Sequence, residues 1–330
     1  MTSRPTHRPR RLRRTPWLRR LVQENRLDTA DLVWPVFIVE GSGERQPIAH
    51  MPGCMRMSID VLAQEVKSAV DEGIPAFALF PATPQELKDE TGREALNPDN
   101  LMCRALKTLK DKVPEAGLIA DVALDPYTSH GHDGLLDDSG YVVNDNTCDI
   151  LAQQAVVLAN AGADIVAPSD MMDGRVSAIR HALEDESHPN TLIMSYAVKY
   201  ASAFYGPFRS GVGSKSALTG DKKTYQMNPG NRMAARREAA LDVDEGADML
   251  MIKPGLPYLD IVREVVDTTD LPVLAYHVSG EYAMLKAAAD NGWLDYEVCL
   301  MEVLTGFKRA GCRGIFTYGA RDAARIINAT

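Results

Sequence analysis

The chain has 330 residues, of which 45% are hydrophobic and 25% are charged, a balance typical of a folded globular protein. No apolar run approaches the roughly 20 residues that a membrane span needs, and the arginine-rich start lacks the apolar segment of a secretory signal. A membrane partner is therefore not expected. The five cysteines lie far apart and are odd in number. They predict neither a disulfide framework nor a zinc finger, and they favour a reducing, cytoplasmic location.

The charge is unevenly distributed along the chain. The first 26 residues contain nine arginines and one acid, Glu24, whereas the remainder contains 27 basic and 44 acidic residues. A basic arm on an acidic body can bind nucleic acid or a neighbouring subunit. The body shows no basic patch of the kind that nucleic-acid binding needs. We therefore expect residues 1–30 to be an arm for subunit contacts in a homo-oligomer, with no nucleic-acid partner.

Residues 31–330 read as strands that alternate with helices. We expect strands at 32–39, 76–81, 117–125, 164–168, 191–198, 248–253, 272–278 and 314–318. Helices are expected at 58–72, 97–112, 145–161, 175–183, 233–245, 258–267, 281–291 and 295–309, with a last helix at the end. Eight apolar strands that alternate with helices predict an α/β fold, a (β/α)8 TIM barrel with an extended N-terminal arm. The alternative is a doubly wound open sheet, which usually has fewer strands and often a glycine-rich dinucleotide fingerprint that is absent here.

Four of these strands follow the same kind of junction, in which a helix ends at a glycine. The glycines are Gly73, Gly162, Gly246 and Gly311. Glycine adopts the left-handed conformation that ends a helix before the chain turns into a strand. The repetition supports a regular series of helix–strand units.

Lys253 follows four apolar residues and precedes Pro254 and Gly255, so it is expected at the carboxyl end of a buried strand. Loss of water disfavours the ammonium form, and such a lysine can become a nucleophile near neutral pH. The alternative is a lysine that extends out of the core to bind an anion. Lys199 ends the neighbouring strand. When two amines lie so close together, repulsion disfavours the state in which both are protonated. A pair of such amines suggests two carbonyl substrates, each held as an imine.

The active sites of such barrels lie at the carboxyl ends of the strands. The other polar residues expected at those ends are Asp121, Asp125, Ser169, Ser279 and Tyr318. The segment 206–230 after Lys199 is rich in glycine and contains Arg209, Lys215, Lys222 and Lys223. It reads as a lid for an anionic substrate, with a surface loop as the alternative. His130 and His132 resemble metal ligands, but two histidines in a loop are more often hydrogen-bonding residues.

Six stretches together resemble the 5-aminolevulinate dehydratase, or porphobilinogen synthase, family. They are DVALDPYTSHGHDG (121–134), SYAVKYAS (195–202), YGPFR (205–209), YQMNP (225–229), MIKPG (251–255) and HVSGEY (277–282). The resemblance covers the chain after the arm. It implies a lyase that condenses two 5-aminolevulinate molecules to porphobilinogen with loss of water, in tetrapyrrole biosynthesis.

The resemblance also assigns roles to residues. Lys253 and Lys199 would each bind one substrate as a Schiff base. Arg209 and Lys222 would hold the carboxylate of one substrate, although the family often has arginine at the second position. Ser279 and Tyr318 would hold the other carboxylate, and Asp121 and Ser169 would polarise groups near the amines. The arm would embrace a neighbouring subunit in an octamer or a hexamer.

The chain departs from the family at the metal positions. Zinc-dependent members have three cysteines where this chain has Ala123, Asp125 and Asp133. We therefore expect no catalytic zinc, because the soft thiolate ligands are missing. Some members use magnesium at a subunit interface through a glutamate that aligns with Glu238. Arginines at 232, 236 and 237 offer a guanidinium in its place, so the expectation is either magnesium as an allosteric activator or no metal.

Two other classes of function remain open at this point. A class I aldolase-like Schiff-base lyase on the same barrel would need one reactive lysine. A non-enzymatic scaffold with a basic arm would bind nucleic acid in a salt-sensitive way.

Overall fold

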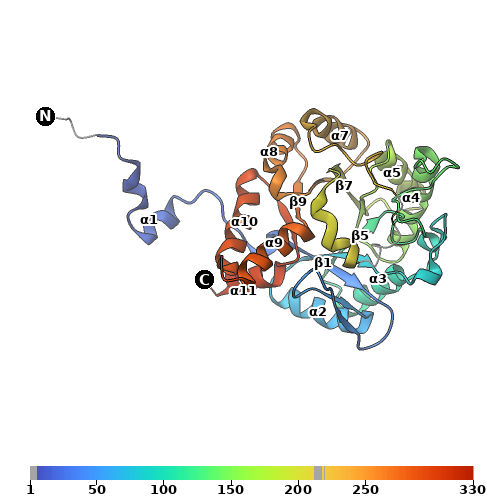
Figure 1. Ribbon diagram of the computed structural model, residues 1–330, viewed down its shortest axis with the longest axis horizontal. Coiled ribbons are helices and arrows are strands. Elements are labelled where there is room, and N and C mark those ends of the chain that lie inside the picture. The colour runs from blue at the N-terminus through green and yellow to red at the C-terminus, as the bar shows by residue number, and fades with distance from the viewer. Residues whose placement is uncertain (1–5, 212–217, 219, 330) are drawn as a thin grey trace.

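The computed structural model describes residues 6–211, 218 and 220–329, without the side chains of Arg209 and Ser210. Within these residues, eight parallel strands close into a barrel in which the last strand pairs with the first. The barrel strands are β1 (Leu32–Ile38), β4 (Ala76–Pro81), β5 (Gly117–Val122), β6 (Ile165–Pro168), β7 (Leu192–Lys199), β8 (Met249–Lys253), β9 (Val273–His277) and β10 (Gly314–Thr317). Figure 1 shows strands at the centre of the body and helices around them. The predicted (β/α)8 barrel is confirmed.

The barrel is surrounded by helices that each bury one apolar face. They are α2 (Ile59–Asp71), α3 (Leu101–Lys112), α4 (Asn144–Asn160), α5 (Arg175–Asp185), α6 (Gly206–Gly211), α7 (Arg232–Asp244), α8 (Leu259–Thr268), α9 (Ser279–Asp290), α10 (Tyr296–Ala310) and α11 (Ala320–Asn328). In α2 the buried residues include Leu62, Val66 and Ala69. Their spacing of three or four places them on one side of the helix, where they pack against the barrel.

The barrel separates two apolar layers. The outer layer lies between strands and helices and includes Leu250 and Ile252 of β8. The inner layer fills the barrel and includes Met251 of the same strand and Phe316 of β10. Because successive side chains of a strand point to opposite faces, an apolar strand can serve both layers. This explains why the strands read as nearly continuous apolar runs.

The four glycine junctions adopt the expected conformation. The φ angles of Gly73, Gly162, Gly246 and Gly311 are 94°, 103°, 98° and 107°, in the left-handed region that favours glycine. At Gly73 a Cβ would also lie 2.6 Å from the hydroxyl oxygen of Thr29. The expectation that glycine ends these helices is confirmed.

Three local features differ from the sequence expectation. A hairpin of β2 (Arg45–Pro47) and β3 (Met55–Met57) adds to the carboxyl end of β1, but its strands are too short to show a pattern. The strand expected at 117–125 ends at Val122, because the carbonyl of Leu124 accepts two turn hydrogen bonds. The segment 206–230 begins with a short helix, α6.

The N-terminal arm projects away from the body (Figure 1). It contains a 3-10 helix, η1 (Pro9–Arg13), and a short helix, α1 (Pro16–Leu21), and neither buries a residue. The main chain reaches β1 through the turn η2 (Thr29–Asp31), and Lys308 of α10 forms an ion pair of 2.7 Å with Asp31 there. None of the helices in the described part of the chain has the length and apolarity to cross a bilayer.

Candidate active site

The alternation of β8 sets the direction of Lys253. Met251 lies in the inner layer and Ile252 in the outer layer. Lys253 is two residues after Met251, so its side chain points into the barrel. Only 7% of its surface is exposed. The structure thus places this lysine at the sheltered strand end that the sequence predicts.

Lys199 points into the barrel because β7 contains an irregularity. Tyr196 lies in the inner layer, and strict alternation would place Val198 there next. Instead the pairing with β8 shifts between Ser195 and Val198, and Val198 lies in the outer layer. An inserted residue of this kind re-aims the next side chain. Lys199 then pairs in register with Lys253, so the two lysines are neighbours on adjacent strands.

Aromatic rings surround the Lys253 amine. Its Nζ lies 4.7 to 5.4 Å from the ring centroids of Tyr196, Tyr205, Phe208 and Tyr276. Burial lowers the pKa of Lys253 to about 7, and the charge of Lys199 acts in the same direction. Aromatic faces favour the cation, but the loss of water outweighs them. At neutral pH a large fraction of this amine is therefore unprotonated.

Lys199 lies among oxygen atoms instead. Its Nζ donates to the main-chain carbonyl of Ser169 and lies 3.7 Å from Oδ2 of Asp133. Burial alone would raise the pKa of Asp133, but the ammonium groups of Lys199 and Lys222 lower it to about 2. Among the described residues, no carboxylate forms an ion pair with Lys253. The two amines thus occupy chemically different surroundings.

Lys222 bridges two buried carboxylates. Its Nζ lies 3.2 Å from Oδ2 of Asp125 and 3.0 Å from Oδ1 of Asp133. Burial lowers the pKa of Lys222, but the two carboxylates outweigh burial and raise it above its usual value. Lys222 is therefore a fixed cation. Its two partners, Asp125 and Asp133, are two of the three residues at which the resemblance implies cysteines in zinc-dependent members.

Asp121 of β5 faces both catalytic candidates. Burial raises the pKa of Asp121 to about 7, with repulsion from Asp125 adding to the effect and attraction to Lys199 and Lys253 opposing it. The side chain of Ser169 hydrogen-bonds Asp121 and lowers its pKa slightly. A carboxyl group with a pKa near 7 can donate and accept protons at neutral pH.

Ser279 and Tyr318 lie on the aromatic side of the site. The Ser279 hydroxyl accepts a hydrogen bond of 2.9 Å from the main-chain N–H of Phe208, whose ring is one of those near Lys253. The hydroxyl of Tyr318 lies 3.0 Å from that of Tyr276. Both predicted substrate contacts are thus connected to the surroundings of Lys253.

One predicted site residue, Glu238, lies apart from this cluster, and another, Arg209, is described by its backbone alone. The backbone of Arg209 lies in α6, but its side chain lies outside the described residues, as does Lys215. Glu238 of α7 lines a separate cavity of about 150 Å3, together with Asp173 and Tyr225. Burial raises the pKa of Glu238. Arg232, which could have neutralised it, forms an ion pair of 2.6 Å with Glu264.

The segment after β7 covers the lysines. A cavity of about 40 Å3 is lined by Asp125, Gly131, Lys199, Tyr205, Phe208, Leu218, Lys222, Gln226 and Lys253. Four of these residues belong to the segment 206–230. The segment is attached to the barrel where the N–H of Met227 donates to the carbonyl of Lys199 at 3.0 Å. Its described part therefore closes the site, as a lid would.

Sequence reasoning missed Glu281, which joins two loops of the site. Its carboxylate accepts hydrogen bonds from the main-chain N–H groups of Leu256 at 3.1 Å and Val278 at 2.9 Å. The first group follows Lys253 and the second precedes Ser279. Burial raises the pKa of Glu281 to about 8. The position of this acid in the first turn of α9 was the available signal, since a carboxylate there accepts main-chain N–H groups.

The histidines of the segment 121–134 take part in hydrogen bonds. His130 Nε2 lies 3.1 Å from the carbonyl of Glu90, and His132 Nδ1 lies 3.1 Å from the hydroxyl of Tyr225. No group of three or more His, Cys, Asp or Glu side chains among the described residues is arranged to hold a metal ion.

The fold is a (β/α)8 barrel, and its candidate site holds two buried lysines at the carboxyl ends of adjacent strands. Residues 6–326 match the delta-aminolevulinic acid dehydratase family. The dehydratase of Bradyrhizobium diazoefficiens is 56% identical over 96% of this chain and 90% of its own length. That of Rhodobacter capsulatus is 52% identical over 98% of both chains.

A solved structure gives the same result. The delta-aminolevulinic acid dehydratase of Toxoplasma gondii, in complex with its product porphobilinogen, is 51% identical and has a TM-score of 0.96. The match covers 98% of this chain and 92% of that chain. The chain belongs to the delta-aminolevulinic acid dehydratase family, which confirms the resemblance drawn from the six stretches. The enzymes of this family are lyases, and the aldolase-like and scaffold alternatives are set aside.

The lowered pKa of Lys253 predicts a pH dependence. Only the unprotonated amine forms an imine, so borohydride trapping of levulinate on Lys253 should fall on acidification, with a midpoint near pH 7. Peptide mass spectrometry would assign the adduct. In Lys199→Ala the repelling charge is gone, and the midpoint should move to higher pH. A midpoint near the usual lysine value of about 10.4 in the wild type would show that burial does not lower this pKa.

Proposed function

We propose that Lys253 and Lys199 hold the two 5-aminolevulinate molecules as imines while the family's condensation to porphobilinogen takes place. The observation that carries this proposal is the in-register pair of buried, inward-pointing lysines at the ends of β7 and β8. Each amine attacks a ketone carbonyl, and each imine forms with loss of one water molecule. Neighbouring strand ends bring the two bound substrates within reach of each other.

Asp121 is proposed to move protons in these steps. Loss of water from a carbinolamine needs a proton donor, and formation of a carbon–carbon bond beside an imine needs a proton acceptor. A buried carboxyl group with a pKa of about 7 can serve as either. Ser169 is proposed to support it through the hydrogen bond to Asp121.

The substrate carboxylates are proposed to bind on opposite sides of the lysine pair. Lys222, with Arg209, provides positive charge on the side of Lys199. The Lys222 ammonium already contacts Asp125 and Asp133. A substrate carboxylate would therefore join these charged groups and would not replace either aspartate. Ser279 and Tyr318 provide hydroxyl donors on the side of Lys253.

The first prediction is that both lysines are essential. Lys253→Ala and Lys199→Ala should each lower turnover by several orders of magnitude, because each removes one imine. Product formation would be measured at saturating 5-aminolevulinate. The control is Lys223→Ala, a change to an exposed lysine next to Lys222, which should leave turnover within about twofold. Wild-type turnover in either lysine variant would contradict the two-imine mechanism.

The residues at the family's zinc position do not fit zinc. Two of them, Asp125 and Asp133, are hard oxygen ligands that already neutralise Lys222, and Ala123 offers no ligand. We infer that the ammonium of Lys222 takes the place of a divalent cation there. Magnesium is proposed to act, if the enzyme uses it, as an activator through Glu238, away from the lysines.

The second prediction concerns metal removal. A zinc-selective chelator at micromolar concentration should leave turnover unchanged, because no thiolate ligand is present to give zinc affinity. Any stimulation by magnesium should disappear in Glu238→Ala while basal turnover stays the same. Asp173→Ala serves as a matched change in the same cavity. Complete inactivation by the chelator, reversed by stoichiometric zinc, would contradict this assignment.

The arm is proposed to assemble the protein into an octamer or a hexamer. Leu12, Trp17 and Leu21 of the arm are each more than half exposed. An open groove of about 710 Å3 lies between the arm and helices α10 and α11. Exposed apolar residues of this size mark interaction sites, and the basic arm complements the acidic body of a second copy. The cytoplasmic location inferred from the cysteines stays a prediction.

The third prediction tests the arm. Deletion of residues 1–26 should give smaller particles in light scattering, because the apolar and charged contacts of the arm are lost. The double change Trp17→Ala and Leu21→Ala should weaken assembly in the same direction while keeping the arginines. A particle mass that is unchanged by the deletion would exclude the arm as an assembly element.

A further inference from the structure

The pairing that closes the barrel at the seam between β1 and β10 stops before the carboxyl end of β1. β10 pairs with residues 32–33 of β1, and β3 pairs with residues 37–38. On this edge of β1, residues 34–36 have no strand partner in the described part of the chain. Pro35 lies in the gap and has no N–H group to offer a partner. The fold therefore leaves an opening in the wall beside the lysine site.

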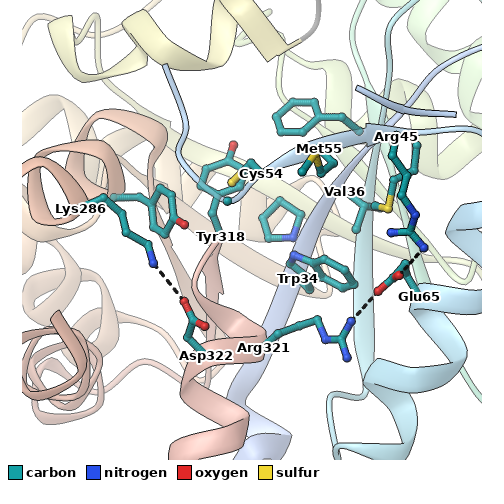
Figure 2. A pocket seen from close by; sticks show the side chains of 15 residues that line it. Trp34, Val36, Arg45, Cys54, Met55, Glu65, Lys286, Tyr318, Arg321 and Asp322 are labelled. Carbon is teal, nitrogen blue, oxygen red and sulfur yellow. Dashed lines mark hydrogen bonds and ion pairs between the residues drawn. The ribbon is translucent and has the colours of Figure 1, made fainter. Parts of the chain in front are cut away.

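A cavity of about 290 Å3 lies at this opening. It lies between the hairpin of β2 and β3, helix α2, helix α9 and helix α11 (Figure 2). Its size approaches that of small-molecule sites. Its lining shares no residue with that of the cavity at Lys199 and Lys253, and Tyr318 is the one residue of the lining to which a role is proposed above.

The lining combines cations with aromatic faces. The charged residues are Arg45, Lys286 and Arg321, with Glu65 and Asp322 as their partners, and the aromatic ones include Trp34, Tyr282 and Tyr318. Figure 2 shows Arg45 and Arg321 converging on Glu65 from opposite sides, and Lys286 directed at Asp322. With Glu72, the second partner of Arg321, the positive and negative groups balance. An anionic ligand is therefore favoured by hydrogen-bond donors that these pairs leave over, and not by net charge.

Arg45 has donors to spare. Glu65 accepts from Arg45 at 2.7 Å and from Arg321 at 2.5 Å, so two guanidinium groups share one carboxylate. Arg321 has a second carboxylate, Glu72, whereas Glu65 is the side-chain partner of Arg45 among the described residues. A guanidinium carries five N–H donors, and the Arg45 side chain is 48% exposed. A ligand carboxylate can therefore bind Arg45 without breaking an existing ion pair.

The cavity is suited to binding and not to covalent chemistry. Burial raises the pKa of the Cys54 thiol to about 12, so the sulfur stays protonated and is a poor nucleophile. The indole of Trp34 lines the cavity, and the Arg321 guanidinium lies over it, 5.7 Å from its centroid, so the wall presents an aromatic side chain beside cations. A planar ring that carries a carboxylate matches both features.

We propose that this seam cavity is a regulatory site for a small aromatic carboxylate. Tyr318 and Phe37 line the cavity and stack on each other with centroids 5.9 Å apart. The Tyr318 hydroxyl contacts that of Tyr276, whose ring lies 4.7 Å from the Lys253 amine. A ligand in the cavity would thus contact Tyr318 on the side of the ring that faces the cavity. The effect on turnover rests on the role proposed for Tyr318, whereas the binding does not.

Binding can be measured by calorimetry on the full chain. Indole-3-carboxylate is the probe, and indole-3-carboxamide, which has the same ring without the charge, is the control ligand. Arg45→Gln should weaken binding of the carboxylate by about tenfold, the effect of one charge-assisted hydrogen bond, and should not affect the amide. The matched protein control is Arg104→Gln, because Arg104 is a similarly exposed arginine paired with Glu40 outside the cavity. That variant should bind like the wild type.

Each alternative outcome is decisive. Equal affinity in Arg45→Gln and wild type would overturn the seam site, as would the absence of binding at millimolar probe. Levulinate at the lysines should weaken probe binding several-fold and then reach a limit, because coupling between two sites is reciprocal, whereas competition without a limit would place the probe at the lysines and overturn the seam site. In turnover assays the probe should raise the KM for 5-aminolevulinate several-fold in the wild type, and much less in Arg45→Gln. Binding with an unchanged KM would overturn the coupling to Tyr318. A failure of the two-imine mechanism would leave the calorimetric result unaffected.

Discussion

Two buried amines on adjacent strands are the constraint around which this molecule is built. Side by side, two ammonium ions repel each other, and the loss of water penalises both charges. The structure resolves this conflict differently for each. Lys199 lies 3.7 Å from Asp133, within a set of carboxylates that includes Asp125. Lys253 lies among aromatic rings, and its pKa is lowered to about 7. Lys199 thus has a carboxylate beside it, whereas Lys253 loses its proton near neutral pH.

The surrounding architecture maintains this difference. The irregularity in β7 turns Lys199 inward beside Lys253. Lys222 brings a third ammonium to the carboxylates, so that Asp133 serves two lysines at once. On the other side, Glu281 ties the loop after Lys253 to the loop before Ser279 through main-chain hydrogen bonds. The contact of Lys222 with Asp133 spans 89 residues of chain and that of Glu281 with Leu256 spans 25, and their removal would shift an amine relative to its neighbours.

Much of the fold and half of the site could be predicted from the sequence. Eight apolar runs and four glycine junctions give the barrel, because strand burial and helix termination are local properties. The strand-end positions of Lys253 and Asp121 follow from the same pattern. The inward direction of Lys199 could not be predicted, since by alternation Val198 should point inward. The hairpin β2–β3 consists of strands of three residues, which are too short for a periodicity to appear. The bridge from Lys222 to Asp125 and Asp133 spans about ninety residues of chain, and only the folded structure brings these groups together.

The asymmetry of the site bears on a problem that is particular to this reaction. The two substrates are chemically identical, yet their roles in the product differ, so the protein alone must distinguish them. We infer that the distinction lies in the surroundings of the two amines and not in the shape of the substrate. Burial and the charge of Lys199 lower the pKa of Lys253 to about 7, so a ketone arriving first meets at Lys253 an amine that is partly unprotonated and lies among aromatic rings. Lys199 lies instead 3.7 Å from the carboxylate of Asp133. We propose that the first imine forms at Lys253 and that the order of binding follows from this difference between the two amines.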